Sequence, residues 1–365
     1  MKTILVCTYL PRHLKKMLPL VKELRKKPDL RVHLVLMTSG EAELAQSCGE
    51  EYSMLDEFTE VPRTADFDLS WVLAPLIHAI DSFKPDLFLC IEVNYILRNA
   101  VRYCKQRRIR SVVVQHGTPN KYSAHAFVPF EGDRFVAWND FSRQFMESHG
   151  VPPEKISVTG GIPFDRTLTM TVDRDAIAAE MGIDAGKRWF VFTTQGTGAG
   201  NMPSPEEVRD GVQKTAMAFS RYPNCLLLFQ VHPSQELAAV TALVPEEMHD
   251  KVIVGRYRDT EALIKVSDGM ITFFSTTAID AVLLRKPLLL INLTDDRDFF
   301  PFVQMGVAAG AYTADEIMPG VERLVSGMSI TESQYEEAER LMNFENDGRA
   351  MDRVLDVISK ECGVM

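Results

Sequence analysis

The sequence predicts an α/β protein made of two consecutive domains, each built on a doubly wound parallel sheet. Apolar runs of strand length alternate with amphipathic helical patterns along the chain, which is typical of parallel sheets covered by helices on both faces. The chain has 365 residues, more than the roughly 250–300 at which a single core usually stops growing. Turn-forming residues crowd together at Gly160-Gly161-Ile162-Pro163, so we expect the two domains to join there.

The first domain is expected at residues 1–165, where apolar runs predict a first set of strands. A helical pattern follows the first run and places Leu14, Met17, Leu18, Val21 and Leu24 on one face. The expected strands cover residues 3–7, 32–37, 87–91, 111–115, 134–138 and 156–159.

The second domain is expected at residues 166–345, after a polar stretch at 167–187. Its expected strands cover residues 189–194, 225–231, 252–254, 270–274 and 287–291. The remaining residues, 346–365, carry the i, i+3, i+4, i+7 pattern of an amphipathic helix at Met351, Val354, Leu355 and Ile358. We expect this helix to pack back toward the first domain.

Composition excludes several classes of protein. The apolar fraction of 46% and the charged fraction of 25% are those of a soluble globular protein, and the net charge of −10 argues against binding to nucleic acid. No run approaches the roughly 20 apolar residues that span a bilayer, and the amino terminus lacks the features of a signal peptide. We therefore expect a cytoplasmic protein with at most peripheral association at the inner face of the membrane.

The cysteines and histidines suggest no metal site. The six cysteines form no CxxC pair, and no group of His, Asp and Cys has a specific metal-ligand spacing. Asp296-Arg297-Asp298 is an Asp-x-Asp sequence, but we do not interpret it as a metal site. The sequence does not determine the oligomeric state.

Two polar clusters mark one edge of the second predicted sheet. His232-Pro233 closes one apolar run, and Ser275-Thr276-Thr277 closes another. Because ligands bind at the carboxyl edge of open α/β sheets, and because free N–H groups where a helix begins favour an anion, these residues predict a phosphate-binding site. The alternative is a helix N-cap beside a structural histidine.

Three further segments belong to the candidate donor site. The loop after the first strand of the second domain contains Thr194, Gly196, Thr197 and Gly198, whose glycines permit close approach to a phosphate or serve only to form a turn. Asp280 lies one helical turn beyond Thr276 and can accept hydrogen bonds from ribose, or act as a capping or solvated acid. Arg297 and Asp298 are candidates for contact with the transferred group or acceptor, and the neighbouring Asp295 and Asp296 fit a solvated loop.

The acceptor hydroxyl needs a base, and His116 is the first candidate. It ends a strand of the first domain, Gly117 and Pro119 fix a turn behind it, and an ordinary histidine titrates near pH 6.5, which suits general-base catalysis. His13, in the segment Pro11-Arg12-His13, and Glu131 are the other candidates; a structural role for His116 is the alternative. Arg12 is a candidate contact for the acceptor or donor group.

Several of these motifs resemble known families. Two tandem doubly wound domains with a cleft between them describe the GT-B architecture. Within that frame, the sequence is similar to the CDP-glycerol glycerophosphotransferases of teichoic-acid synthesis and shares a histidine-proline motif with capsule Kdo transferases and bacterial sialyltransferases. The segments that carry the resemblance are Gln115-His116-Gly117-Thr118-Pro119 followed by Lys121, Gly161-Ile-Pro163-Phe164-Asp165, His232-Pro233, residues 267–287, and Asn346-Asp347-Gly348-Arg349 with Arg353.

A second resemblance leads to the non-hydrolysing UDP-N-acetylglucosamine 2-epimerases, which share this architecture. Residues 16–21 are close to the first helix of these enzymes, and residues 294–298 are loosely similar to their late arginine-bearing loop. Three motifs differ: the serine-glycine-glycine phosphate loop is replaced by Ser275-Thr276-Thr277, the paired acids by Ile279-Asp280, and the glutamate-alanine-glycine segment by His116-Gly117-Thr118.

The resemblances imply a transferase that takes a sugar or polyol phosphate from a nucleotide-activated donor to a glycan or polyol acceptor of a surface or capsular polymer. The donor, linked to CDP, CMP or UDP, is a substrate, so no cofactor is expected. An epimerase acting on a UDP-sugar is the first alternative, and a noncatalytic nucleotide-sugar-binding subunit is the second. The residues do not reveal the donor base, the acceptor or the stereochemical outcome.

Overall fold

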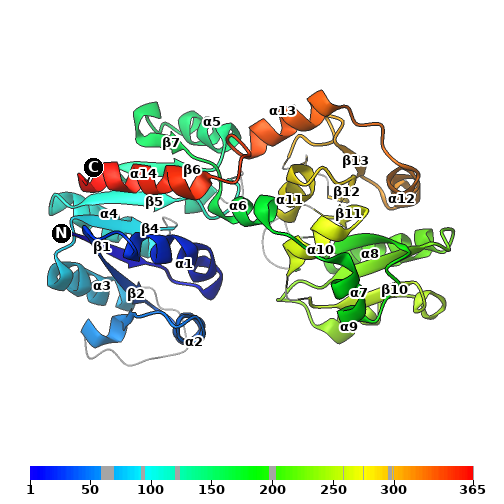
Figure 1. Cartoon of the computed structure of the whole chain (residues 1–365), viewed down its shortest axis with the longest axis horizontal. Coiled ribbons are helices and arrows are strands. Elements are labelled where there is room, and N and C mark those ends of the chain that lie inside the picture. The colour runs from blue at the N-terminus through cyan, green and yellow to red at the C-terminus, as the bar shows by residue number, and fades with distance from the viewer. Residues whose placement is uncertain are drawn as a thin grey trace. The chain divides into compact units, whose positions relative to one another are not determined.

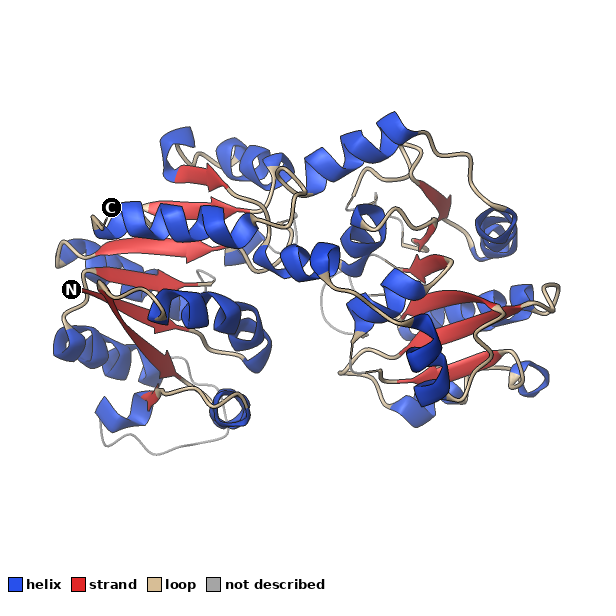
Figure 2. Ribbon diagram, viewed as in Figure 1, coloured by secondary structure: helices blue, strands red, loops and turns tan. Residues whose placement is uncertain are grey.

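The computed structural model describes residues 1–58, 70–91, 95–119, 124–196, 203–257, 259–273, 275–294, 298 and 300–364. The chain forms two compact units, each with one parallel sheet and helices on both of its faces (Figures 1 and 2). The first unit contains Met1–Asp165 and Asn343–Met365, and the second contains Arg166–Met342. Two doubly wound α/β domains are thus confirmed.

The sheet of the first unit has seven strands in the order β3-β2-β1-β4-β5-β6-β7, and every pair in it is parallel. The order reverses between β1 and β4, and this switch point is where open α/β sheets bind ligands. The strands are β1 (Lys2–Cys7), β2 (Leu30–Leu36), β3 (Ser53–Met54), β4 (Leu87–Cys90), β5 (Arg110–Val114), β6 (Arg134–Ala137) and β7 (Ile156–Val158).

Helices cover both faces of this sheet because successive strand residues point to opposite sides. Ile4 and Val6 pack in one apolar cluster with α1 and α14, whereas Leu5 and Cys7 pack in another with α3, α4 and α5. The helices of this unit are α1 (Pro11–Arg25), α2 (Ser39–Ser47), α3 (Ser70–Phe83), α4 (Tyr95–Gln106), α5 (Asp140–Ser148) and α14 (Ala350–Cys362).

The sheet of the second unit has six parallel strands in the order β10-β9-β8-β11-β12-β13. Its switch point lies between β8 and β11. The strands are β8 (Arg188–Thr193), β9 (Cys225–Gln230), β10 (Val252–Gly255), β11 (Gly269–Thr272), β12 (Leu288–Ile291) and β13 (Ala308–Ala311).

The central strand β8 shows how the second core is divided. Trp189 and Val191 pack with residues of α7 and α10, while Phe190 and Phe192 pack with α8 and α12. The helices are α6 (Ile162–Thr169), in which the chain passes from the first unit to the second, α7 (Arg174–Met181), α8 (Pro205–Phe219), α9 (Leu237–Thr241), α10 (Thr260–Val266), α11 (Thr277–Leu283), α12 (Ile317–Ser326) and α13 (Glu332–Met342).

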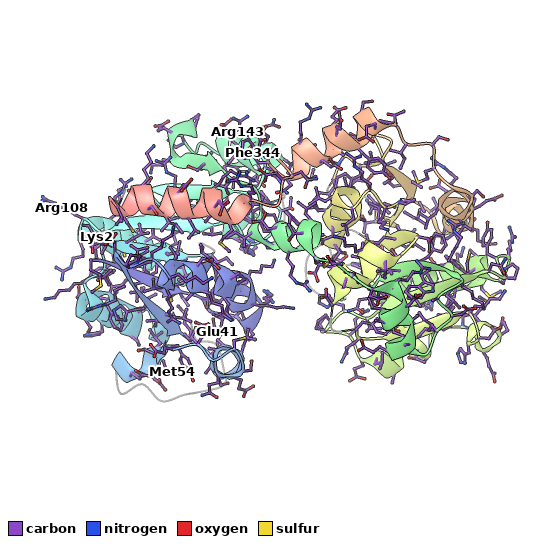
Figure 3. All side chains as sticks on the ribbon, in the orientation of Figure 1. Lys2, Glu41, Met54, Arg108, Arg143 and Phe344 are labelled. Atoms are coloured by element: carbon purple, nitrogen blue, oxygen red, sulfur yellow. The ribbon has the colours of Figure 1, made fainter. Side chains whose placement is uncertain are left out.

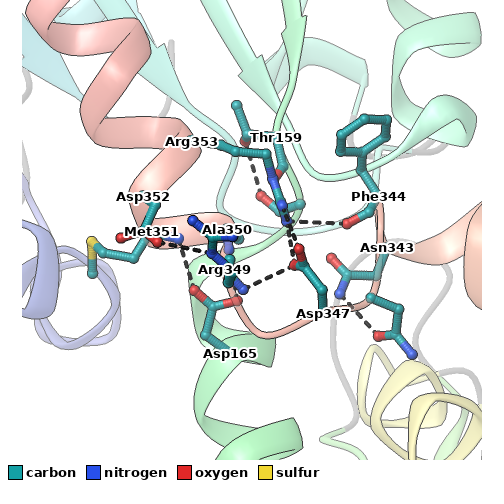
Figure 4. Close-up of polar contacts among 12 residues, drawn as sticks. Thr159, Asp165, Asn343, Phe344, Asp347, Arg349, Ala350, Met351, Asp352 and Arg353 are labelled. Atoms are coloured by element: carbon teal, nitrogen blue, oxygen red, sulfur yellow. Dashed lines mark hydrogen bonds and ion pairs between the residues drawn. The ribbon is translucent and has the colours of Figure 1, made fainter.

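The C-terminal segment completes the first unit (Figure 4). Asp165 accepts hydrogen bonds from the N–H groups of Ala350 and Met351 at 2.9 and 2.7 Å, and so caps α14. Arg353 donates to the Thr159 carbonyl at 2.6 Å and pairs with Asp347 at 2.8 Å. Hydrogen bonds and an ion pair therefore hold residues 159–165 against the segment that begins at Asn346.

Two strands were not predicted. β3 has only two residues, and β13 has the sequence Ala-Ala-Gly-Ala, which lacks the β-branched and aromatic residues that favour strands. Both lie at a sheet edge, where pairing with a strong neighbour fixes the conformation. Within the described residues, no helix has both the length and the apolar character to cross a membrane.

Candidate functional site

Three neighbouring strands of the second unit end at the same level. Thr193, the last residue of β8, lies opposite Gln230 at the end of β9 and opposite Thr272 at the end of β11. The segments that follow these strands therefore emerge side by side at the carboxyl edge, next to the switch point. These segments contain the expected donor residues Thr194, His232 and Ser275, so the structure brings the predicted clusters together.

His232 is held by the loop after β8. Its backbone N–H donates to Thr194 Oγ1 at 3.0 Å, and its side-chain Nδ1 lies 2.7 Å from Ser234 Oγ and accepts from the Ser234 N–H at 3.2 Å. A ring nitrogen that accepts carries no proton, so the neutral ring carries its proton on Nε2. Both His232 and the following Pro233 are exposed at this edge of the sheet.

Gly196 brings the two loops close together. A Cβ on this residue would lie 2.3 Å from Ser234 Oγ and 3.5 Å from His232 Nδ1, so only glycine fits without a shift. The loop thus needs glycine for close approach to its neighbour. The other two donor-loop candidates, Thr197 and Gly198, lie outside the described residues.

A chain of hydroxyl groups lies beneath the edge. Thr193 Oγ1 donates to Thr272 Oγ1 at 2.8 Å and lies 3.1 Å from Thr277 Oγ1. Thr193 and Thr272 are buried, Ser275 and Thr277 are half-buried, and Thr276 is exposed. The hydroxyl that remains most accessible to a ligand is therefore that of Thr276.

We expected free N–H groups at the start of α11, but the N–H groups of its first three residues all have acceptors. The Thr277 N–H donates to Ser275 Oγ at 3.3 Å, and the N–H groups of Ala278 and Ile279 donate to the carbonyls of Ser275 and Thr276 at 3.0 Å. The tight first turn satisfies its own donors, so an anion would have to be bound by side chains and by the loops.

Asp280 and Asp298 both have internal hydrogen-bond partners. Asp280 is only 8% exposed and accepts from Thr167 Oγ1 at 3.1 Å, so it joins α11 to α6. Asp298 accepts from Asn292 Nδ2 at 3.1 Å and from the Tyr312 hydroxyl at 2.5 Å. It therefore lies near the ends of β12 and β13. Arg297, Asp295 and Asp296 lie outside the described residues.

In the first unit, His116 follows β5 and is fixed by the residue before it. Gln115 is 2% exposed; its side-chain amide donates to the Gly117 carbonyl at 2.9 Å and to Ser142 Oγ at 2.8 Å, and accepts from the Trp138 N–H at 2.8 Å. The His116 ring stacks on Phe127 with 5.3 Å between centroids. Lys121 lies outside the described residues.

His13 lies beside His116, with 5.1 Å between ring centroids, and is 1% exposed. Burial, followed by the charges of His116, Arg12 and Lys16, lowers the pKa of His13 to about 3. Burial, followed by the charges of Lys16 and Arg12, also lowers the pKa of His116 to about 3, although a hydrogen bond to the Ile91 backbone opposes this. The expected titration near neutral pH is therefore wrong for His116 in this state, because both rings are uncharged far below pH 6.5.

Arg12 and Glu131 differ in their relation to this pair. Arg12 is exposed on the first turn of α1, directly before His13. Glu131 precedes β6, whereas His116 follows β5, so the parallel strands place Glu131 toward the other edge of the sheet. Arg102 binds Glu131 at 2.7 Å, and this hydrogen bond lowers the pKa of the Glu131 carboxyl. The structure therefore brings His13 together with His116, and does not bring Glu131 to them.

Sequence reasoning assigned no individual role to three residues of these sites. Ser234 orients His232 and lies only two residues beyond it, Gln115 directly precedes His116, and Thr193 ends a predicted strand. Proximity to a candidate histidine was the available signal for the first two. Among the described residues, no three His, Cys, Asp or Glu side chains gather in a way that could hold a metal ion.

These features define a protein of two doubly wound α/β domains with the GT-B fold. The chain belongs to the CDP-glycerol:poly(glycerophosphate) glycerophosphotransferase family, whose sequence model matches residues 87–360. No curated protein matches the chain in sequence.

Solved structures show the same fold. Staphylococcus aureus MnaA with UDP is 17% identical, with 100% of this chain and 98% of that chain covered and a TM-score of 0.72. Neisseria meningitidis UDP-GlcNAc 2-epimerase with UDP-GlcNAc is 16% identical, with 99% and 100% covered and a TM-score of 0.68. The wall teichoic acid polymerase TagF is 12% identical, with 99% and 89% covered and a TM-score of 0.63.

Proposed function

We propose that the protein transfers glycerol phosphate from CDP-glycerol to the end of a poly(glycerophosphate) acceptor. The observation that carries the proposal is the meeting of Thr194, His232 and Thr276 at the switch point of the second sheet, in a chain that belongs to the glycerophosphotransferase family. Hydroxyl groups and an imidazole N–H are suitable donors for a diphosphate. No resident cofactor is needed, because the activated donor is itself the substrate.

The transfer is a displacement at phosphorus. The acceptor hydroxyl oxygen forms a bond to the phosphorus of the glycerophosphate group, the bond from that phosphorus to the CMP oxygen breaks, and the hydroxyl proton passes to a base. Negative charge grows on the departing CMP phosphate, so preorganised donors aimed at it lower the barrier. His232 Nε2–H and the Thr276 hydroxyl fit this role.

His116 is the proposed base, with His13 as the second candidate. Its neutral form is already present at pH 7, but a pKa of about 3 makes it a weak base in the free protein. A phosphate near Arg12 and Lys16 would offset the two cationic charges that lower this pKa and would favour the imidazolium form. Binding of a phosphate group beside Arg12 and Lys16 would then strengthen the base for the transfer step.

We further propose that the reaction takes place in the cytoplasm, at the inner face of the membrane. None of the six cysteines, all of which lie among the described residues, forms a disulfide, which fits a reducing compartment. Capsular polymers with phosphodiester linkages are a related class of product.

The test compares His232→Gln with His249→Gln. His249 is also an exposed histidine of the second unit, but it precedes β10 and so lies toward the amino edge. We expect His232→Gln to weaken CDP binding by about tenfold or more, the worth of one charge-assisted hydrogen bond, with an unchanged melting temperature. His249→Gln should leave both unchanged. Equal affinity for CDP in wild type and His232→Gln would refute the donor role.

A turnover assay separates transfer from epimerisation, which proteins of the same fold carry out. Wild type should release CMP from CDP-glycerol only when poly(glycerol phosphate) is present, and His116→Gln should abolish release while CDP affinity stays within about threefold. Conversion of UDP-GlcNAc without any acceptor would overturn the transferase proposal in favour of an epimerase.

A further inference from the structure

A cationic depression lies at the amino edge of the first sheet, away from the residues considered so far. Figure 3 labels two of its residues, Lys2 and Arg108, at the end of the first unit that carries both chain termini in Figure 1. The depression has a volume of about 510 Å³. Its charged lining consists of Lys2, Lys84, Arg107, Arg108 and Arg110 with Asp81, Asp86 and Glu361, so five cations face three carboxylates on a chain whose net charge is −10.

The three carboxylates are already neutralised within the depression. Arg107 pairs with Asp81 at 2.8 Å and Lys2 with Asp86 at 2.8 Å, and Arg110 pairs with Glu361, which also binds Arg134. Lys84 and Arg108 are exposed, and neither has an ion pair among the described residues. These two side chains carry the charge available to a ligand.

The backbone at these two positions is unusual. Lys84 directly follows α3 and Arg108 follows the end of α4, with φ angles of 46° and 59°, in the left-handed region where glycine is favoured. Four other helices end with glycine in this conformation, at Gly49, Gly150, Gly182 and Gly363. Arg108 makes the same closing hydrogen bonds, from its N–H to the Lys105 carbonyl and from the Ile109 N–H to the Cys104 carbonyl, but with a side chain that adds strain.

Arg285 shows what offsets this strain elsewhere. It closes α11 with a φ of 54°, and its guanidinium binds Glu332 at 2.5 Å and Glu339 at 2.7 Å. The corresponding anions for Lys84 and Arg108 are missing from the described part of the chain. Backbone strain that no contact within the protein offsets is found at active sites and ligand-binding sites.

We propose that Lys84 and Arg108 bind phosphodiester groups of the acceptor polymer at a second contact, remote from the transfer site. This inference rests on the proposed function, because the acceptor is then a polyanion. A strand of four to seven residues spans only roughly 13–23 Å at 3.3 Å per residue, so a polymer held at the carboxyl edge can reach the amino edge of the same sheet.

The shape and lining of the depression favour a polymer over a membrane surface. Of its apolar lining residues, Ile80 and Cys362 are 0% and 5% exposed, Pro85 is buried and Ile109 is half-buried, so the depression exposes no large apolar side chain to lipid. A concave site with two exposed cations suits discrete phosphate groups, whereas a membrane-binding face usually combines cations with exposed aromatic or aliphatic side chains.

The experiment measures binding of fluorescein-labelled poly(glycerol phosphate) to the full chain without donor. We expect Lys84→Gln with Arg108→Gln to weaken binding about three- to thirtyfold at low salt, and less than about twofold near 0.5 M salt, where exposed charges are screened. The matched control removes the same charge from two exposed arginines of the second unit, by Arg221→Gln with Arg323→Gln, and should not alter binding.

A second variant separates a ligand-binding role from a structural one. Arg108→Gly should raise the melting temperature by about 2–4 °C, because glycine relieves the left-handed strain, and should weaken polymer binding at the same time. Arg285→Gly should lower the melting temperature, because Arg285 has structural ion pairs. A fall in melting temperature for Arg108→Gly would overturn the proposal.

Two other outcomes would also overturn it: equal loss of polymer binding in the control double variant, or loss of binding to phosphatidylglycerol vesicles with polymer binding intact, which would make the patch a membrane contact. Because no donor is present, the result does not depend on turnover, so a failed transfer assay and a failed binding assay remain distinct.

Discussion

Buried His13 and half-buried His116 make the first unit sensitive to acid. His13 and His116 have pKa values of about 3, against about 6.5 in an unfolded chain. Between these values the unfolded chain takes up a proton at each histidine and the folded unit does not. The free energy of unfolding is therefore fully retained above pH 6.5 and falls as the pH drops from 6.5 toward 3.

The size of the effect follows from the width of this window. At pH 5, which is 1.5 units below the unfolded pKa, each histidine lowers the free energy of unfolding by about 2 kcal/mol, at 1.36 kcal/mol per unit. The substitution His13→Gln removes one titrating group. We therefore expect the loss between pH 7.5 and pH 5 to be about 2 kcal/mol smaller in this variant than in wild type.

Tryptophan fluorescence during urea unfolding can report this unit alone. The chain has three tryptophans, and a Trp189→Phe background leaves Trp71 and Trp138, both within Met1–Asp165. Exposed His149 provides the control, since His149→Gln should keep the wild-type pH dependence. If His13→Gln loses as much stability as wild type on acidification, His13 is protonated in the folded protein and the explanation by burial fails.

Three further substitutions test particular contacts. Gly196→Ala places a Cβ where Ser234 Oγ lies and should weaken CDP binding about tenfold by calorimetry, while the added change Ser234→Ala should restore most of the affinity; no restoration would contradict the steric account. Asp165→Ala removes the cap of α14 and should lower the free energy of unfolding by about 1–2 kcal/mol, with faster hydrogen exchange at Ala350 and Met351 than in Asp352→Ala. Gln115→Leu leaves the Trp138 N–H and the Gly117 carbonyl without their hydrogen-bond partner. It should lower the free energy of unfolding by about 2–4 kcal/mol and remove most of the turnover. Full activity would show that the turn does not need Gln115.

The fold was largely readable from the sequence because buried parallel strands are nearly continuous apolar runs. The runs at Cys225–Gln230 and Leu288–Ile291 need no tertiary information to be recognised. β13 was missed because its four small residues acquire strand geometry only by pairing with β12. The local sequence pattern therefore predicts strands that are rich in apolar residues, and it does not predict edge strands that form only by pairing with a neighbouring strand.

The candidate sites were only partly readable, because their properties depend on packing. His232 and Thr194 were expected together, since residues that follow adjacent parallel strands share an edge. The low pKa of His116 depends on burial and on Lys16, which comes from a helix 100 positions away. The position of Glu131 relative to His116 could not be predicted, because the path of a long loop cannot be derived from its composition.

The first unit is assembled from two separate stretches of the chain, which constrains the order of synthesis. Its core includes Val354, Leu355 and Ile358 of α14, so a ribosome must deliver the chain through α14 before this core can close. The second unit, Arg166–Met342, is continuous and can fold as soon as it has emerged. Residues 1–165 must therefore remain available, with an apolar face uncovered, until α14 has been synthesised.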